Sequence, residues 1–282
     1  MFQRQTIDPC DSPAFSHAGF DLDSPAHRRD LLKALGLGGV LLLAGGVLVY
    51  HTIAQSETAQ LNGDLCHSGM PAPTHIAVLL DWTDTPSDPQ HRLLETSLRH
   101  RIDELTVGAR FSLYLLTPGM KAVVTELFSR CKPKDGAHAD WFKETPRLFE
   151  KRYREQFQAP FEAALAKLKD APSSEISPLL EAIHAIIKQP AFIKAQSRRL
   201  EIWSDMLQNV PGVMTHFKPG YSVDQLKSTL YRTDMTELAG ADVRIYQFKR
   251  QQYAQFQTAA HNQFWEDYFQ ALKVGYYERS RL

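Results

Sequence analysis

An uncharged apolar segment near the N-terminus constrains this chain more than any other feature. Residues 34–50, ALGLGGVLLLAGGVLVY, contain no charged side chain and consist mainly of Leu, Val, Gly and Ala. With the apolar residues on either side, the segment reaches roughly 20 residues, the length that a helix needs to cross a bilayer. A buried helix of a globular domain would carry polar side chains at every third or fourth position. The sequence therefore predicts a transmembrane anchor over residues 31–54.

Basic residues lie on only one side of this segment. Arg28, Arg29 and Lys33 precede it, and no Lys or Arg follows it until Arg92. Because basic flanks stay in the cytoplasm, we expect a single-pass protein of the bacterial inner membrane with its C-terminal domain in the periplasm. The words RRDLLK and ALGLGG also resemble a twin-arginine export signal, which could be cleaved after Ala54. We favour a retained anchor, and both alternatives predict the same compartment for the domain.

The apolar segment divides the chain into four parts. Residues 1–30 lack apolar periodicity and are expected to form a flexible cytoplasmic tail. Residues 55–74 are polar and contain Pro and Gly, which is typical of a linker. Residues 75–282 are long enough to form a folded domain. The whole chain has 32 basic and 32 acidic residues, and this balance argues against a nucleic-acid partner.

Short apolar runs alternate with helical patterns in residues 75–282. The run HIAVLL has no polar alternation, as expected for a strand that is covered on both faces. Strands are predicted at residues 75–80, 110–116, 122–128, 200–203 and 243–248. Helices are predicted at residues 88–105, 148–169, 178–188, 223–238 and about 256–272, and Pro160 should kink or divide the second of them. The alternation predicts an α/β domain with a doubly wound, mostly parallel sheet flanked by helices.

Oxygen-bearing side chains follow two of these strands and open one helix. Asp81 ends the first strand and begins the word D-x-T-x-T, and Asp205 follows the strand at residues 200–203. Ligands of open α/β sheets collect at the carboxyl ends of the strands. Carboxylates and hydroxyls together suit a hard divalent cation. The sequence therefore predicts a site for Mg²⁺, or for Mn²⁺ or Ca²⁺, formed by Asp81, Thr83, Thr85, Ser177 and Asp205.

The order of three words resembles the von Willebrand factor A (vWA) domain with its metal-ion-dependent adhesion site. These words are DWTDT, SPLLEAI and SDM, and the resemblance covers residues 75–275. It implies a vWA/Rossmann-like fold in which hydroxyls of the first two words bind the metal. Asp81, which opens the first word, and Asp205, in the last, would bind directly or through water. A sixth position would stay open for a carboxylate of a partner protein.

This sequence departs from the family pattern at each hydroxyl. Thr83 and Thr85 stand where the family has serines, and Ser177 stands where it has threonine. Hydroxyl chemistry survives at all three positions, although the additional methyl groups crowd the first word. Ser174, in the word PSSEIS, is an alternative to Ser177.

The resemblance implies a binding or assembly module for a protein of a membrane or envelope complex, and not an enzyme. One alternative is a haloacid-dehalogenase-like phosphohydrolase with Asp81 as nucleophile. In that family an acid/base aspartate stands where this chain has Thr83, so the leaving group would lack its proton donor. Another alternative is a metal-free structural subunit, in which Thr83 and Thr85 are ordinary turn residues.

The three cysteines fall on both sides of the predicted membrane segment. Cys10 lies in the predicted cytoplasmic tail, whereas Cys66 and Cys131 follow the anchor. Because exported cysteines tend to pair in an oxidising compartment, we expect a Cys66–Cys131 disulfide. Two unrelated thiols are the alternative. No cysteine belongs to a CxxC motif.

Overall fold

The computed structural model of this chain describes residues 33, 36, 38–48, 61–117, 123–139, 144–228 and 238–282. The chain divides into two compact units, Met1–Thr58 and Ala59–Leu282. The predicted tail, residues 1–30, lies outside the described residues, and the predicted linker is described from residue 61 onward.

Part of the predicted anchor is described, and that part is helical. Residues 38–48 form a helix in which the Val and Leu side chains are 56–80% exposed. Among the residues that the structure describes, no helix is both long and apolar enough to cross a membrane. The transmembrane assignment of residues 31–54 stays a prediction.

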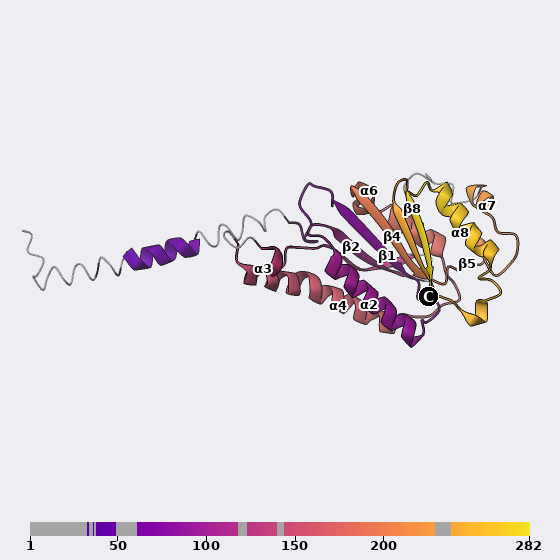
Figure 1. The fold of residues 1–282 in the computed structure, drawn as a ribbon, viewed down its shortest axis with the longest axis horizontal. Helices are drawn as coiled ribbons and strands as arrows, with labels where there is room; N and C mark the ends of the chain where they lie inside the picture. The colour runs from indigo at the N-terminus through magenta and orange to yellow at the C-terminus, as the bar shows by residue number, and fades with distance from the viewer. Residues whose placement is uncertain are drawn as a thin grey trace, which may run out of the picture. The chain divides into compact units, whose positions relative to one another are not determined.

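A six-stranded sheet forms the centre of the second unit, in the order β3-β2-β1-β4-β7-β8 (Figure 1). Neighbouring strands are parallel, except that β3 runs antiparallel to β2. The predicted α/β architecture with a mostly parallel sheet is therefore confirmed. The strands are β1 (Thr74–Leu80), β2 (Arg110–Leu116), β3 (Val124–Cys131), β4 (Ser197–Ser204), β7 (Asp242–Gln247) and β8 (Tyr276–Arg281).

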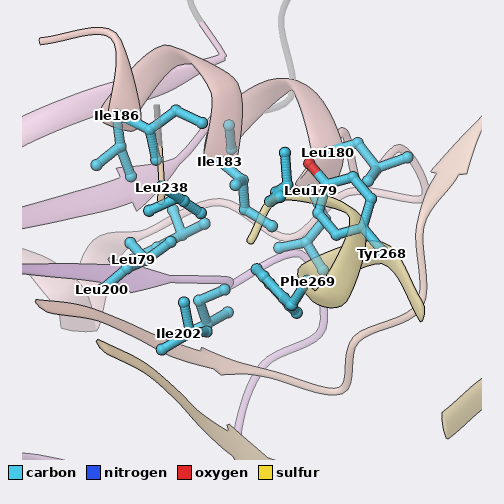
Figure 2. Close-up of a cluster of buried hydrophobic side chains, with 14 of the residues drawn as sticks. Leu79, Leu179, Leu180, Ile183, Ile186, Leu200, Ile202, Leu238, Tyr268 and Phe269 are labelled. Carbon is cyan, nitrogen blue, oxygen red and sulfur yellow. The ribbon is translucent and has the colours of Figure 1, made fainter. Parts of the chain in front are cut away.

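Helices cover both faces of this sheet (Figure 1). Successive side chains of a strand point to opposite faces. In β1, Val78 and Leu80 pack with α2 and α4, whereas Leu79 packs with α5 and α8. Figure 2 shows the face of the sheet that carries Leu79, with Ile183 of α5 above it. The helices are α2 (Asp88–Glu104), α3 (Pro146–Arg152), α4 (Ala159–Ala166), α5 (Leu179–Ile187), α6 (Pro190–Lys194), α7 (Val223–Ser228) and α8 (Ala259–Ala271).

The long helical region after residue 145 is divided, as Pro160 predicts, although the change begins before the proline. A π-helical segment, Tyr153–Gln158, separates α3 from α4, and a 3₁₀ turn, Lys167–Asp170, follows α4. Pro160 has no amide hydrogen to donate to the carbonyl of Gln156 four residues earlier. Arg130 Nη1 of β3 donates to that carbonyl instead, at 2.7 Å. The aromatic side chains of this region pack in the core, and Phe157 and Phe161 are buried.

Several elements differ from the sequence-based prediction. Strand β8, helix α6 and the short hairpin of β5 (Asn209–Val210) and β6 (Met214–Thr215) are absent from it. The strand predicted at residues 122–128 is described from Val124 and extends to Cys131. The helix predicted at residues 223–238 is described only over Val223–Ser228, since most of the remainder lies outside the described residues.

The predicted disulfide is present. Cys66 and Cys131 are joined with an S–S distance of 2.01 Å across 65 residues of sequence. The amide of Cys131 also donates to the carbonyl of Asp64 at 2.9 Å. The bond thus fixes the segment before β1 to the last residue of β3.

Candidate metal-binding site

The candidate site lies at the carboxyl ends of β1 and β4, which are neighbours in the sheet. Leu80 is paired with Trp203 in the parallel register of these strands, and the amide of Asp81 donates to the carbonyl of Trp203 at 2.9 Å. The chain therefore leaves both strands at the same level. This places Asp81 beside Ser204 and Asp205, as expected for strand-end residues of an open α/β sheet.

Asp81 is a buried acceptor for hydrogen bonds from three segments of the chain. Its Oδ1 accepts from the amide of Thr83 at 3.1 Å and from the Thr83 hydroxyl at 2.6 Å. Its Oδ2 accepts from the hydroxyls of Ser177 at 3.2 Å and Ser204 at 2.7 Å. A hydroxyl that donates its proton to a carboxylate keeps its lone pairs for another partner. The hydroxyl oxygens of Thr83 and Ser177 can therefore bind a cation through lone pairs that face away from Asp81.

Ser177 reaches Asp81 because the loop before α5 is fixed to the loop after β4. The backbones of Ser177 and Asn209 form a β-bridge, and the amide of Leu180 in the first turn of α5 donates to Gln208 Oε1 at 2.9 Å. The alternative residue Ser174 accepts from the amide of Ile176 with its hydroxyl, at 3.0 Å. Of these two serines, Ser177 is the one that contacts Asp81.

Asp205 is buried next to other carboxyl groups. Its side chain is 6% exposed, its Oδ1 accepts from the amide of Leu207 at 2.9 Å, and its Oδ2 lies 3.9 Å from Arg250 Nε. Burial, with the nearby charge of Asp81, raises the pKa of Asp205 well above its usual range. Burial also raises the pKa of Asp84, against the nearby charge of Arg250, which lowers it. A divalent cation would relieve this crowding of negative charge.

A left-handed residue directs the chain away from Asp205. Met206 has a φ of 65°, which is an unfavourable conformation for a residue with a side chain. Its carbonyl accepts from His261 Nε2 at 2.7 Å and from Trp265 Nε1 at 2.9 Å. Both donors belong to α8, so the helix holds the loop that presents Asp205.

A buried histidine next to this loop predicts acid sensitivity. Nδ1 of His216 accepts from the amide of Gln208 at 3.0 Å, and burial followed by the neighbouring His261 lowers the pKa of His216 to about 3. The unfolded chain therefore binds a proton at this residue below about pH 6.5, where the folded protein does not. The free energy of unfolding must then decrease as the pH falls from about 6.5 toward 3.

Replacing His216 with asparagine tests this contribution, since the Asn oxygen can still accept from the Gln208 amide. We expect His216→Asn to reduce the slope of unfolding free energy against pH by about 1 kcal/mol per pH unit between pH 6 and 4. Urea denaturation across that range measures the slope. Gln270→Asn, at an exposed position of α8, changes no titratable group and should leave the slope unchanged. An equal slope in wild type and His216→Asn would contradict the expectation.

A cavity of about 480 Å³ opens beside this group. Three of the five predicted ligands, Thr83, Ser177 and Asp205, line it together. Asp81 is buried behind the hydroxyls that it accepts from, and Thr85 is exposed, with its carbonyl accepting from Arg250 Nη1 at 3.1 Å. The full lining is Thr83, Asp84, Ser173, Ser174, Glu175, Ser177, Asp205, Leu207, Asn209, Phe217 and Tyr253.

Three residues of the site were not part of the sequence-based set. Ser204 and Asp84 belong to the motifs SDM and DWTDT. The sequence-based prediction takes its metal ligands from other residues of the same motifs. Arg250 follows β7, which is paired with β4. The rule that ligands gather at strand ends would have pointed to Arg250 only if the order of the strands had been known.

The donors around the cavity fit a hard cation such as Mg²⁺. Thr83, Ser177, Asp84 and Asp205 supply hydroxyl and carboxylate oxygens, which are the ligand types that Mg²⁺, Mn²⁺ and Ca²⁺ take. Within the described part of the chain, no group of three or more His, Cys, Asp or Glu side chains is placed to hold a metal ion. An ion in this cavity would thus be held by hydroxyls as well as carboxylates.

Solved structures, but no described sequence family, are similar to this chain. No protein-family description matches the sequence, and no curated protein matches it. Among solved structures, the fold is similar to the crystal structure of the ArnB paralog VWA2 from Sulfolobus acidocaldarius, with a TM-score of 0.38 and 10% identity. The alignment covers 74% of this chain and 42% of that chain, so this chain spans less than half of that protein's length.

Proposed function

We propose that this chain is a membrane-anchored periplasmic module that recognises a partner protein through a divalent metal held by a vWA-like domain. One observation carries the proposal: the hydroxyls of Thr83 and Ser177 donate to the same Asp81 carboxylate and line one open cavity with Asp205. Two hydroxyls oriented by a shared buried carboxylate form a prearranged set of cation ligands. The partner would belong to a membrane or envelope complex.

The position of the site supports a binding role. The cavity lies at the carboxyl ends of the central strands and contains side chains from the loops after β1 and β4 and before α5. A metal with several protein oxygens can keep an open position for an oxygen of another protein. The aromatic side chains of Phe217 and Tyr253 also line the cavity, and aromatic residues are enriched in protein interfaces.

The phosphohydrolase alternative receives less support from the geometry. Asp81, which would have to attack phosphorus, is 3% exposed and does not line the cavity. Both of its oxygens accept hydrogen bonds from neighbouring residues. A buried carboxylate in this setting is better suited to orient hydroxyls than to act as a nucleophile.

Metal binding predicts a large gain in stability that depends on Asp205. At a hundredfold excess over the dissociation constant, a bound ion should raise the free energy of unfolding by about 2.7 kcal/mol. Thermal melts of the full-length chain with millimolar Mg²⁺ or Mn²⁺ and with EDTA measure this gain. Asp205→Ala should abolish it, whereas Asp267→Ala, at an exposed position of α8, should retain it. Equal wild-type midpoints with metal and with EDTA would favour the metal-free structural alternative.

Partner recognition should follow the metal. We expect affinity capture with the full-length chain to retain a specific protein in Mg²⁺ and to lose it in EDTA or on Asp205→Ala. The Asp267→Ala variant serves as the matched control. Retention that is indifferent to EDTA and to Asp205→Ala would contradict recognition through a metal.

The proposed topology has its own test. A reporter fused after Leu282 should be active only if it is of the kind that folds and works in the periplasm, because the basic flank of residues 31–54 precedes the apolar segment. A paired cytoplasmic reporter at the same position should be inactive. The reverse pattern would contradict the orientation.

A further inference from the structure

The loop that follows β1 orients its side chains differently from the way the vWA resemblance implies. That resemblance assigns metal-binding hydroxyls to Thr83 and Thr85. Thr83 is buried and lines the cavity, whereas Thr85 is exposed and is not among the lining residues. Asp84, which lies between them, does line the cavity.

Asp84 and Asp205 line the same cavity. Their side chains come from different loops, after β1 and after β4. Asp84 is half-buried, so its carboxyl is accessible from the cavity that the predicted ligand Asp205 also lines. An oxygen at this place is available to an ion that also contacts Asp205 and the hydroxyls of Thr83 and Ser177.

Arg250 fixes this orientation of the loop. Its Nη2 donates to the carbonyl of Asp84 at 2.7 Å, and its Nη1 donates to the carbonyl of Thr85 at 3.1 Å. The guanidinium is planar and rigid, so two bonds to consecutive carbonyls restrain the backbone between them. The Arg250 side chain is 8% exposed and lies 3.9 Å from Asp205. The same side chain therefore contacts both loops that supply the carboxylates.

We propose that Asp84 binds the metal in place of Thr85 and is its second carboxylate ligand, after Asp205. Arg250 is the positioning residue that turns Asp84 inward and Thr85 outward. This inference rests on the proposed metal site. It changes the charge of the site, because the three carboxylates of Asp81, Asp84 and Asp205 are then accompanied by one guanidinium, that of Arg250. Their two net negative charges are neutralised by one divalent cation. The loaded site then has no need of a negatively charged partner group, and a neutral oxygen of the partner or a water can complete it.

Calorimetric titration of Mn²⁺ and of Mg²⁺ into the full-length chain in mild detergent tests the assignment. Asp84→Asn should weaken binding by about tenfold or more, whereas Thr85→Ala, at the next residue of the same loop, should stay within about twofold of wild type. Asp84→Ser provides a smaller neutral substitute if the Asn variant fails to fold. Melts in EDTA check the fold, and Asp84→Asn should melt no lower than wild type there, since a carboxyl beside Asp205 has been removed.

The positioning role of Arg250 must be tested with a measurement that a general loss of structure would not change. Once Arg250→Gln releases the loop, the Thr85 hydroxyl can turn inward, so Thr85→Ala should weaken Mn²⁺ binding more in the Arg250→Gln background than in wild type. Such non-additivity in a double-mutant cycle reports a direct coupling of the two positions. Additive effects of Arg250→Gln and Thr85→Ala on Mn²⁺ binding would contradict the positioning role of Arg250.

The outcomes separate this inference from the proposed function. Wild type that binds Mn²⁺, with affinity lost on Thr85→Ala and kept on Asp84→Asn, would overturn the assignment of Asp84 and leave the metal site standing. Wild type that binds neither ion would overturn both. Binding that is lost on Asp84→Asn and kept on Thr85→Ala supports Asp84 as a ligand.

Discussion

Replacing Cys66 with serine is expected to lower the free energy of unfolding by about 4 kcal/mol, because the disulfide closes a long loop and restricts the unfolded chain. The bond spans 65 residues of sequence, which include β1, α2 and β2. Urea denaturation of oxidised wild type and of Cys66→Ser measures the difference. Cys131→Ser should produce a loss of the same size, since either substitution opens the same loop.

Two controls accompany this measurement. Cys10→Ser removes a cysteine that is not part of the disulfide and should leave the denaturation midpoint unchanged. On non-reducing gels, oxidised wild type should migrate faster than the reduced sample, and Cys66→Ser should remove the difference. Equal stabilities of wild type and Cys66→Ser under oxidising conditions would show that the bond contributes nothing to stability.

The second large effect is expected at Asp81. Asp81→Ala leaves the hydroxyls of Thr83, Ser177 and Ser204 without the buried acceptor that they share. Unsatisfied buried donors and lost bonds to a charged group each cost about 1–3 kcal/mol, and relief of the repulsion with Asp205 offsets part of the sum. We expect a net loss of about 3 kcal/mol in EDTA, where no metal contributes.

Asp81→Asn separates the charge from the hydrogen bonds. The amide retains one acceptor oxygen and the size of the side chain, so about half of the loss should be recovered in EDTA. Metal binding should still be lost, because the hydroxyls of Thr83 and Ser177 would no longer both donate to a carboxylate. Denaturation curves with EDTA and with millimolar Mg²⁺ give both quantities. Wild-type stability of Asp81→Ala in EDTA would mean that Asp81 does not organise the site.

The central elements of the fold could be predicted because their residues are buried in regular patterns. Strand β1 is apolar at consecutive positions since both of its faces are covered. Helix α2 has Leu94, Leu98 and Ile102 on its buried face, spaced by one turn. The disulfide could be predicted from the expected compartment, since only Cys66 and Cys131 follow the predicted anchor.

The peripheral elements could not be predicted from the same patterns. Strand β8, YYERSR, is an edge strand without a fully buried residue, so apolar alternation is missing from it. Strands β5 and β6 have two residues each, which is too short for any period to be seen. The hydrogen bonds of β8 are made with β7, from which α8 separates it in the sequence, and a single sequence does not show such a pairing.

The residue types of the candidate site could be predicted from the sequence, but the orientations of its side chains could not. The words DWTDT and SDM locate the loops, and the structure brings Asp81, Thr83, Ser177 and Asp205 together. The contacts of Arg250 determine which side chains of DWTDT point inward. The position of Arg250 follows from the order of the strands in the sheet and not from a local sequence motif.

The Cys66–Cys131 bond also determines which part of the domain carries tension when the chain is pulled from its N-terminal side. A force applied before residue 66 passes through the sulfur atoms to residue 131 and onward, so the polypeptide between the two cysteines bears no covalent load. That shielded stretch contains β1, α2 and β2, together with the first word of the candidate site. A pull from a membrane anchor would reach the sheet at the end of its edge strand β3, leaving the loop that begins at Asp81 out of the path of the force.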